Sequence, residues 1–240
     1  MQASPEQQSL VLELQLLDNE IMQANTKLKS LPEVEQLLHI DKRIITATDE
    51  VATVKLEADQ ITLELRRGEV DVETVTDRIK KDEVRLASGN ATPKELEQTQ
   101  HEIQTLKKRQ LALEEIELEI MVRSEAITAR TNTLTTDLAS LETLKAEINQ
   151  RLTAATSEIN SLIANKQKDR QVVAVKIEKV LLDLYEKIRT SSGVGAAALV
   201  GNKCNGCNLA INAVEMQRIK TLPLDEVLRC EECRRILVRI

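Results

Sequence analysis

Residues 10–31 read LVLELQLLDNEIMQANTKLKSL, and their apolar positions recur at alternating steps of four and three. This spacing places one stripe of apolar side chains along a helix and is the heptad signature of a coiled coil. We therefore expect a coiled-coil helix here, with a seam formed by Leu10, Leu14, Leu17, Ile21, Ala24, Leu28 and Leu31.

The heptad pattern is interrupted twice. Pro32 predicts a kink near residues 29–33, because proline removes a helical donor and clashes with the preceding turn. The seam then resumes from Leu37 to Leu86, before a cluster of turn-forming residues predicts a turn near 87–93. Thr92, Pro93 and Glu95 have the pattern of a helix N-terminus, so a second helix is expected from there to Ser191-Ser192-Gly193.

Two heptad helices joined by a short turn most simply fold back as an antiparallel hairpin. With the pivot near residue 90, residue n is expected to face residue 180 − n, so that residue 10 lies opposite residue 170. The same periodicity also fits two helices that each pair with another chain. Sequence alone therefore leaves open a monomer or a homodimer.

The composition argues against an enzyme. The 240 residues include no Phe, no Trp and one Tyr (Tyr185), while 30% are charged, as in long helices rather than a compact body with a cleft. No apolar run approaches the ~20 residues of a membrane span, and the first residues lack a signal-peptide pattern, so we expect a cytoplasmic protein. Tyr185 is expected to pack between the coiled coil and the C-terminal module.

The C-terminal module carries all four cysteines, in two C-x-x-C pairs separated by 22 residues. This pattern predicts one structural zinc ion with four thiolate ligands, because two such knuckles complete a closed tetrahedron with no open position for water. Disulfides would need an oxidising compartment, a thioredoxin-like pair would need a βαβ context, and a RING domain would need eight ligands. The predicted metal ligands are Cys204, Cys207, Cys230 and Cys233.

Short segments with strand character flank the knuckles at 196–200 and 236–240, and an amphipathic stretch lies between them at 214–219. The predicted fold is therefore mainly α. It consists of a long antiparallel coiled-coil helical hairpin over residues 1–192, followed by a small C-terminal C4 zinc ribbon over residues 193–240. So small a ribbon is expected to depend on its metal for folding.

This architecture resembles the bacterial C4-type zinc-ribbon coiled-coil protein family, related to a flagellar regulator of Helicobacter and a homologue in Chlamydia. Two positions depart from the family pattern. Residues 211–213 (Ile-Asn-Ala) replace a proline-rich segment, and Arg234 replaces a glycine after the last cysteine. The matching positions are Gly193, Gly195, Gly201, Cys204, Gly206, Cys207, Cys230, Cys233 and Arg235-Ile236-Leu237.

The resemblance implies a non-enzymatic protein that binds partners. Family members are described as binding proteins, among them the alternative sigma factor 54 and flagellar or secretion components, and in one lineage messenger RNA. For this chain the first hypothesis is accordingly a zinc-binding adaptor or scaffold whose coiled coil and ribbon dock protein partners, in the regulation of transcription or assembly.

The second hypothesis is RNA or DNA binding through the ribbon, which is the more basic end of a chain of net charge −6. The ribbon has no aromatic side chain on which a base could stack, and the charge of four thiolates with one zinc offsets its excess of basic residues. The candidate nucleic-acid or partner contacts are Lys203, Arg218, Lys220, Arg229, Arg234, Arg235 and Arg239.

Overall fold

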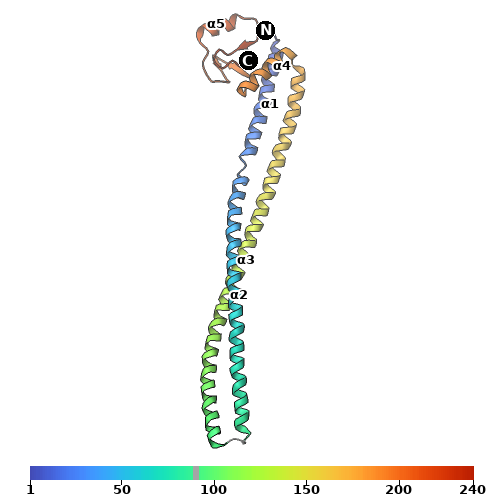
Figure 1. The fold of residues 1–240 in the computed structure, drawn as a ribbon. Helices are drawn as coiled ribbons and strands as arrows, with labels where there is room; N and C mark the ends of the chain where they lie inside the picture. Colours follow the sequence, from blue (N-terminus) through green and yellow to red (C-terminus); the bar gives the residue numbers. More distant parts are fainter. Residues whose placement is uncertain (89–91) are drawn as a thin grey trace. The chain divides into compact units, whose positions relative to one another are not determined.

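The structure of this protein is a computed structural model that describes residues 1–88 and 92–240, and the predicted mainly α class is confirmed (Figure 1). Two compact units are present. The first combines Met1–Val34 with Gln150–Ile240, and the second is Glu35–Asn149. The helices are α1 (Pro5–Lys29), α2 (Pro32–Ala87), α3 (Pro93–Lys176), α4 (Lys179–Ser192) and α5 (Ala213–Thr221). The strands are β1 (Ala196–Val200), β2 (Lys203–Cys204), β3 (Leu228–Arg229) and β4 (Ile236–Arg239).

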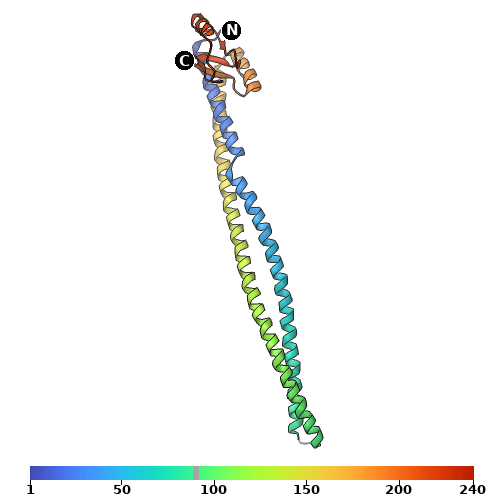
Figure 2. The same ribbon diagram turned by 90° about the vertical axis from the view of Figure 1, so that its left-hand side faces the viewer.

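The second unit is a pair of antiparallel helices, formed by most of α2 and the first part of α3, which lie side by side in both views (Figures 1 and 2). Apolar side chains meet along the predicted seam, where Val75 and Ile79 of α2 pack with Ile103 of α3. Asp82, a buried carboxylate of α2, accepts a hydrogen bond from Arg78 at 3.0 Å.

The register of the hairpin differs from the predicted one. Asp41 pairs with Lys145 at 2.7 Å and Glu64 pairs with Arg123 at 2.8 Å, so the residue numbers of these two pairs add up to 186 and 187 rather than 180. Nearer the turn the sums scatter around this value, with 180 for Arg78–Glu102 and 190 for Lys107–Glu83. The displacement of about seven residues is one heptad. A shift of one heptad keeps the same residues at the seam, so the periodicity predicted the packed faces but not the pairing along them.

The ends of the hairpin helices follow local capping rules. The chain leaves the helix at Ser30 and Leu31, and α2 begins at Pro32, where the missing proline N–H costs nothing. At the start of α3 the Thr92 amide donates to Glu95 at 2.7 Å and the Glu95 amide donates to the Thr92 hydroxyl at 3.4 Å, which confirms the predicted capping box. Residues 89–91 of the predicted turn lie outside the described residues.

The prediction of one continuous second helix up to residue 192 is wrong, because α3 ends at Lys176 and a separate α4 begins at Lys179. The side chain of Gln7, from α1, replaces the interrupted backbone hydrogen bonds. Its Nε2 donates to the Lys176 carbonyl at 2.9 Å, and its Oε1 accepts from the Glu178 amide at 2.7 Å. The break thus depends on a residue distant in sequence. Residues 176–179 include no proline or glycine that would have predicted it.

The ribbon is a four-stranded sheet in the order β2-β1-β4-β3, and the predicted strands at 196–200 and 236–240 are its two central, parallel strands. Alternate residues face opposite sides of this sheet. Ala196, Ile236 and Val238 belong to the cluster that also contains Tyr185, whereas Ala197 and Leu237 belong to the cluster around the cysteines. The ribbon therefore uses one face to attach to the helices and the other to support the cysteines.

Candidate metal centre

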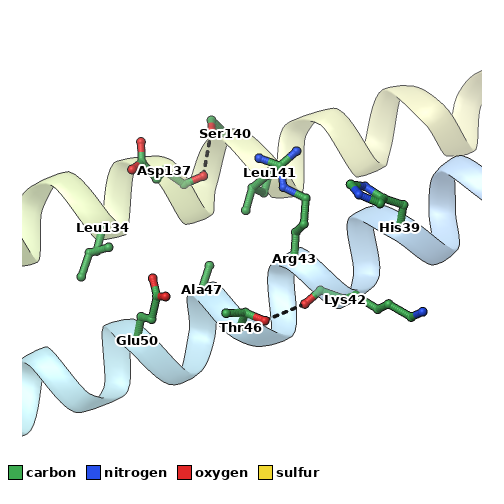
Figure 3. Close-up of a pocket in the computed structure, with 10 residues that line it drawn as sticks. All are labelled: His39, Lys42, Arg43, Thr46, Ala47, Glu50, Leu134, Asp137, Ser140 and Leu141. Carbon is green, nitrogen blue, oxygen red and sulfur yellow. Dashed lines mark hydrogen bonds between the residues drawn. The ribbon is translucent and has the colours of Figure 1, made fainter.

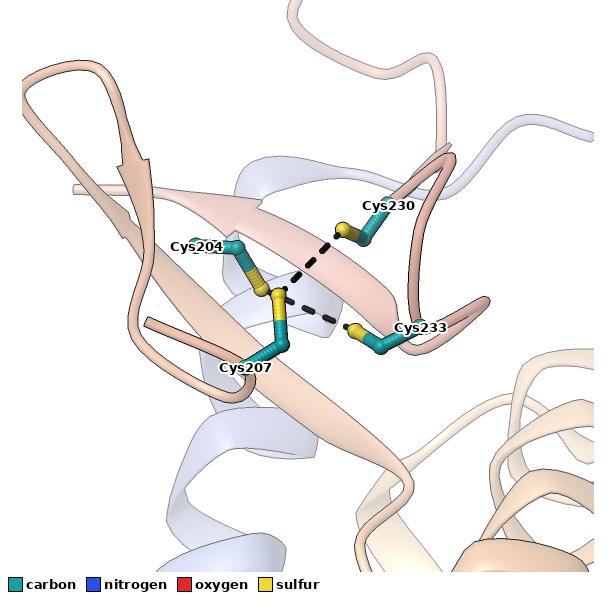
Figure 4. A group of neighbouring side chains, drawn as sticks. All are labelled: Cys204, Cys207, Cys230 and Cys233. Atoms are coloured by element: carbon teal, nitrogen blue, oxygen red, sulfur yellow. Dashed lines mark hydrogen bonds between the residues drawn. The ribbon is translucent and has the colours of Figure 1, made fainter. Parts of the chain in front are cut away.

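The four cysteines come together from the two ends of the sheet (Figure 4). Their sulfur atoms all lie within 4.8 Å of one another, with 3.8 Å between Cys204 and Cys233 and 3.9 Å between Cys207 and Cys230. A tetrahedral zinc site with Zn–S distances of about 2.3 Å has sulfur–sulfur separations of about 3.8 Å. The four sulfurs therefore fit a single zinc ion, and they are much too far apart for disulfides.

Both knuckles repeat one backbone pattern. In the first knuckle the Cys204 amide donates to the Leu209 carbonyl at 3.1 Å, and in the second the Cys230 amide donates to the Arg235 carbonyl at 3.0 Å. The residue after the second cysteine of each knuckle, Asn208 or Arg234, has a positive φ of 60° or 62°. Asparagine tolerates this left-handed conformation, whereas arginine adopts it at a cost that a glycine would not have.

The protein environment by itself does not favour four thiolates. Burial raises the pKa of Cys204, although the Gly206 and Cys207 amides act in the opposite direction, and burial raises the pKa of Cys233 to about 12. The pKa of Cys207 is lowered, chiefly by a hydrogen bond from the Leu209 amide. Backbone N–H groups thus solvate the sulfurs in part, and a cation is needed to hold all four as thiolates.

The first knuckle is fitted closely against the sheet at Gly206. A Cβ atom at this position would lie 2.8 Å from the Cβ of Ala197, so only glycine allows the approach. The guanidinium of Arg235 donates to the Gly206 carbonyl and crosses from the second knuckle to the first. Arg235, predicted as a contact residue, thereby braces the metal centre.

The remaining predicted contact residues divide into two groups. Arg229 donates to the Arg234 carbonyl at 3.0 Å, Arg218 forms a bidentate pair with Glu215, and Arg239 donates to a series of carbonyls between Ile219 and Glu226. The second group of predicted contact residues is exposed and forms no hydrogen bond or ion pair with any described residue. It consists of Lys203, Lys220 and Arg234.

A polar cluster that the sequence analysis missed attaches the ribbon to the helices. Asp18 of α1 is buried and accepts hydrogen bonds from Arg170 of α3 at 2.7 and 3.1 Å and from the Tyr185 hydroxyl of α4 at 2.7 Å. Gln15, one turn earlier, accepts from the Gly195 amide at 2.6 Å and from the Ala196 amide at 3.2 Å. Three helices and β1 thus meet at two side chains of α1.

Hydrophobic contacts also attach the ribbon to the helices. Tyr185 is fully buried among Val11 and Leu14 of α1 and Ile236 of β4, which confirms that it packs between coiled coil and ribbon. Burial and the hydrogen bond to Asp18 raise its pKa, so the hydroxyl stays protonated as a donor. One feature of the sequence indicates this second contact of the helix. Residues 10–17 contain more apolar residues than the seam positions of one heptad stripe.

Comparison with known proteins matches both parts of the chain. Residues 14–193 match the CT398-like coiled coil hairpin domain, and residues 203–237 match the C4-type zinc ribbon domain. The chain belongs to the family of CT398-like coiled-coil hairpin proteins. The predicted hairpin and C4 zinc ribbon, and the resemblance from which family membership was expected, are confirmed. The chain therefore carries one structural zinc ion.

The similarity to individual relatives extends over the full length of this chain. Rv2229c of Mycobacterium tuberculosis is 30% identical over 240 residues, which cover 100% of this chain and 98% of the relative. A structure from Mycobacterium smegmatis matches with a TM-score of 0.82 at 29% identity and covers 100% of both chains. The structure of CT398 from Chlamydia trachomatis matches with a TM-score of 0.60 at 19% identity over 98% of each chain.

Neither matched domain is a catalytic one, and the coiled-coil hairpin and zinc ribbon support a scaffold-like role. Among the helices of the described residues, none combines the length and the apolar character needed to cross a membrane.

Proposed function

We propose that this CT398-like protein is a non-catalytic scaffold that docks protein partners in the regulation of transcription or assembly, with a ribbon surface ordered by zinc bound to Cys204, Cys207, Cys230 and Cys233. The observation that carries the proposal is that the ribbon exposes apolar side chains while most of its arginines are bonded within the fold. Its arginines are largely engaged in holding the fold, whereas several large apolar side chains are exposed. Those exposed side chains are Val200, Leu209, Val214 and Leu224.

Exposed apolar side chains next to a rigid framework are typical of protein-docking surfaces. Val214 on α5 is 81% exposed and Leu224 is 67% exposed, so neither contributes much to the core. A cavity of about 70 Å³ lies between α5 and the second knuckle, with Ile219 and Leu237 among its apolar lining and Glu231 and Glu232 among its acidic lining. Its size suits one aliphatic side chain of a partner.

The anchoring cluster supports the same function. A docking surface keeps its geometry only if it is held rigidly, and Gln15 and Asp18 connect the ribbon to three helices through hydrogen bonds of 2.6–3.2 Å. Because the ribbon is small, zinc is expected to supply much of its folding free energy. Partner binding should therefore require the metal, although the metal performs no chemistry.

A second candidate function is nucleic-acid binding through the three uncommitted basic residues, Lys203, Lys220 and Arg234. They are exposed and able to contact phosphates. Three contacts give only modest affinity that falls with salt, and the ribbon lacks an aromatic platform for bases. Protein docking is therefore the preferred function.

Affinity capture from native cell lysate, with and without nuclease, distinguishes the two functions. The baits are the wild-type protein, Cys230→Ser, the apolar-surface variant Val214→Asp/Leu224→Asp, and the triple variant Lys203→Ala/Lys220→Ala/Arg234→Ala. A scaffold predicts a protein prey that survives nuclease, is retained by the triple variant and is lost from the other two variants. Recovery of RNA or DNA that only the triple variant and Cys230→Ser lose would instead assign the ribbon to nucleic acid.

A further inference from the structure

Two arginines of the ribbon are connected to cysteine sulfurs through single peptide groups. In the first knuckle the amide of Cys207 donates a hydrogen bond to the sulfur of Cys204. The carbonyl of that same peptide group belongs to Gly206, and it accepts a hydrogen bond from the guanidinium of Arg235. A positive charge at the oxygen of a peptide polarises its N–H, so Arg235 strengthens the hydrogen bond to Cys204.

The second knuckle has the same kind of connection, made by another arginine. The amide of Arg235 donates to the sulfur of Cys233. The carbonyl of that peptide group belongs to Arg234, and it accepts from the guanidinium of Arg229 at 3.0 Å. Each guanidinium is thus linked to one sulfur by the carbonyl and the N–H of a single peptide.

The two sulfurs that are linked to arginines are neighbours in the metal centre. Cys204 and Cys233 come from different knuckles, and their sulfur atoms lie 3.8 Å apart (Figure 4). Burial raises the pKa of both cysteines, so both gain as thiolates from a positive charge nearby. The arginines therefore act on the sulfurs that the protein interior favours least as thiolates.

The position of Arg235 is not explained by hydrogen bonding alone. Its side chain is partly buried, and its Nε is buried without a hydrogen-bond partner among the described residues. A buried donor that has no acceptor destabilises a fold. Four thiolates with one zinc ion carry a charge of about −2, and the attraction between this charge and the guanidinium offsets the cost.

An arginine of the hairpin provides a contrast. Arg43 lines the pocket between α2 and α3, and Figure 3 draws no hydrogen bond from its guanidinium to the residues around it. Its side chain is exposed, as is usual for a solvated charge on a coiled coil. Arg229 and Arg235 differ from it because each donates to a carbonyl beside a metal ligand.

We propose that Arg235 and Arg229 supply the positive charge that balances the zinc–thiolate centre, and that they raise its affinity for zinc through the peptide groups that donate to Cys204 and Cys233. They are positioning residues, because each acts through a peptide group. This inference goes beyond the proposed scaffold function and does not depend on the identity of a partner.

The two arginines should differ in the size of their effect. Arg235 is partly buried, where charges are screened little, so Arg235→Met should lower the zinc affinity about 10- to 100-fold. Arg229 is exposed, so Arg229→Met should lower the affinity less than about fivefold, and high salt should remove this effect. The matched control is Lys203→Met, which removes an exposed positive charge directly beside Cys204 that contacts no peptide carbonyl of the described residues.

The test measures zinc affinity of the full chain by competition with a chelator of known affinity, at low and at high salt. We expect wild-type affinity for Lys203→Met, a small loss at low salt for Arg229→Met, and a large loss at both salt concentrations for Arg235→Met. Arg235→Lys keeps a positively charged donor and should lie between the wild type and Arg235→Met. A side chain that only fills space would give equal losses with Lys and with Met.

Cobalt in place of zinc gives a second readout that packing alone does not change. Its d–d bands report tetrahedral coordination, and its sulfur-to-cobalt charge-transfer band reports how readily the thiolates give up electron density. Hydrogen bonds to the sulfurs lower that tendency. The charge-transfer band should therefore move to longer wavelength in Arg235→Met, and by less in Arg229→Met, while the d–d bands stay unchanged. If Arg235→Met loses the d–d bands, Arg229→Met and Arg235→Lys decide the outcome.

The proposal is overturned if Arg235→Met binds zinc as tightly as Lys203→Met, or if Arg235→Lys loses as much affinity as Arg235→Met. A charge-transfer band that stays in place in all the arginine variants would overturn it as well. None of these results would affect the proposed scaffold function, which is tested by the capture of a protein in the experiment above.

Discussion

Replacement of Asp18 by Asn tests the anchoring of the ribbon most sharply. The Asp18 side chain is 6% exposed and accepts two charge-assisted hydrogen bonds from Arg170 and one from Tyr185. Asparagine keeps the size of the side chain but removes the charge, and its amide group opposes the guanidinium with another donor. A buried charge that loses its partner typically costs about 3–5 kcal/mol.

The structure reduces that estimate somewhat. Arg170 keeps an ion pair with Glu186 at 2.5 Å, and the Tyr185 hydroxyl keeps Gln15 as an acceptor at 3.2 Å. We therefore expect Asp18→Asn to lower the free energy of unfolding of the first unit by about 2–4 kcal/mol. The matched control is Asp41→Asn, whose ion pair with Lys145 is nearly half exposed and should contribute less than about 1 kcal/mol.

Tyr185 provides the assay, since it is the only tyrosine and the chain has no tryptophan. Its fluorescence during urea unfolding reports on the cluster in which Asp18 lies. The expected result is a large decrease of the urea midpoint for Asp18→Asn and a small change for Asp41→Asn. Equal midpoints for the two variants would refute the conclusion that Asp18 is an anchoring residue.

Three further substitutions test the packing and the knuckles, each by thermal or urea unfolding. Gly195→Ala should lower stability by about 1–3 kcal/mol, because its Cβ would lie 2.6 Å from the Tyr185 ring, and an unchanged Tyr185 signal would contradict this. Gly68→Ala should instead stabilise the hairpin by about 0.5–1 kcal/mol, since the nearest atom lies 3.8 Å away in a helix, and a loss of stability would mean that the helices pack more closely. Arg234→Gly should stabilise the zinc-loaded ribbon by about 1 kcal/mol by relieving the positive φ of 62°, whereas Glu232→Gly in the same knuckle should not; equal effects would remove backbone strain as the cause.

Periodicity and cysteine spacing were enough to predict the helical hairpin and the zinc ribbon. Both signals are local in sequence, because a heptad or a C-x-x-C pair can be recognised within a few residues and predicts the geometry of the side chains it contains. The strands at 196–200 and 236–240 and the capping box at Thr92 were likewise predicted from short patterns.

The features that sequence analysis missed depend on partners distant along the chain. The register expected from a pivot near residue 90 was displaced by about one heptad in the pairs away from the turn, and the seam could not correct it because it repeats after seven residues. The break between α3 and α4 depends on Gln7, about 170 residues away, and the burial of Gln15 and Asp18 depends on Tyr185 and β1. Polar residues in a coiled-coil helix are usually solvated, so nothing local distinguished these two from their exposed neighbours.

Hydrogen exchange, measured by mass spectrometry before and after removal of zinc with a chelator, tests the central claim most directly. If one zinc ion orders the ribbon as a docking surface on an independently stable hairpin, chelation should abolish amide protection across residues 196–239. Protection should weaken in α1 and α4, which pack on the ribbon, and stay unchanged over 35–149. Unchanged protection of the ribbon, or loss of protection throughout both units, would contradict this account.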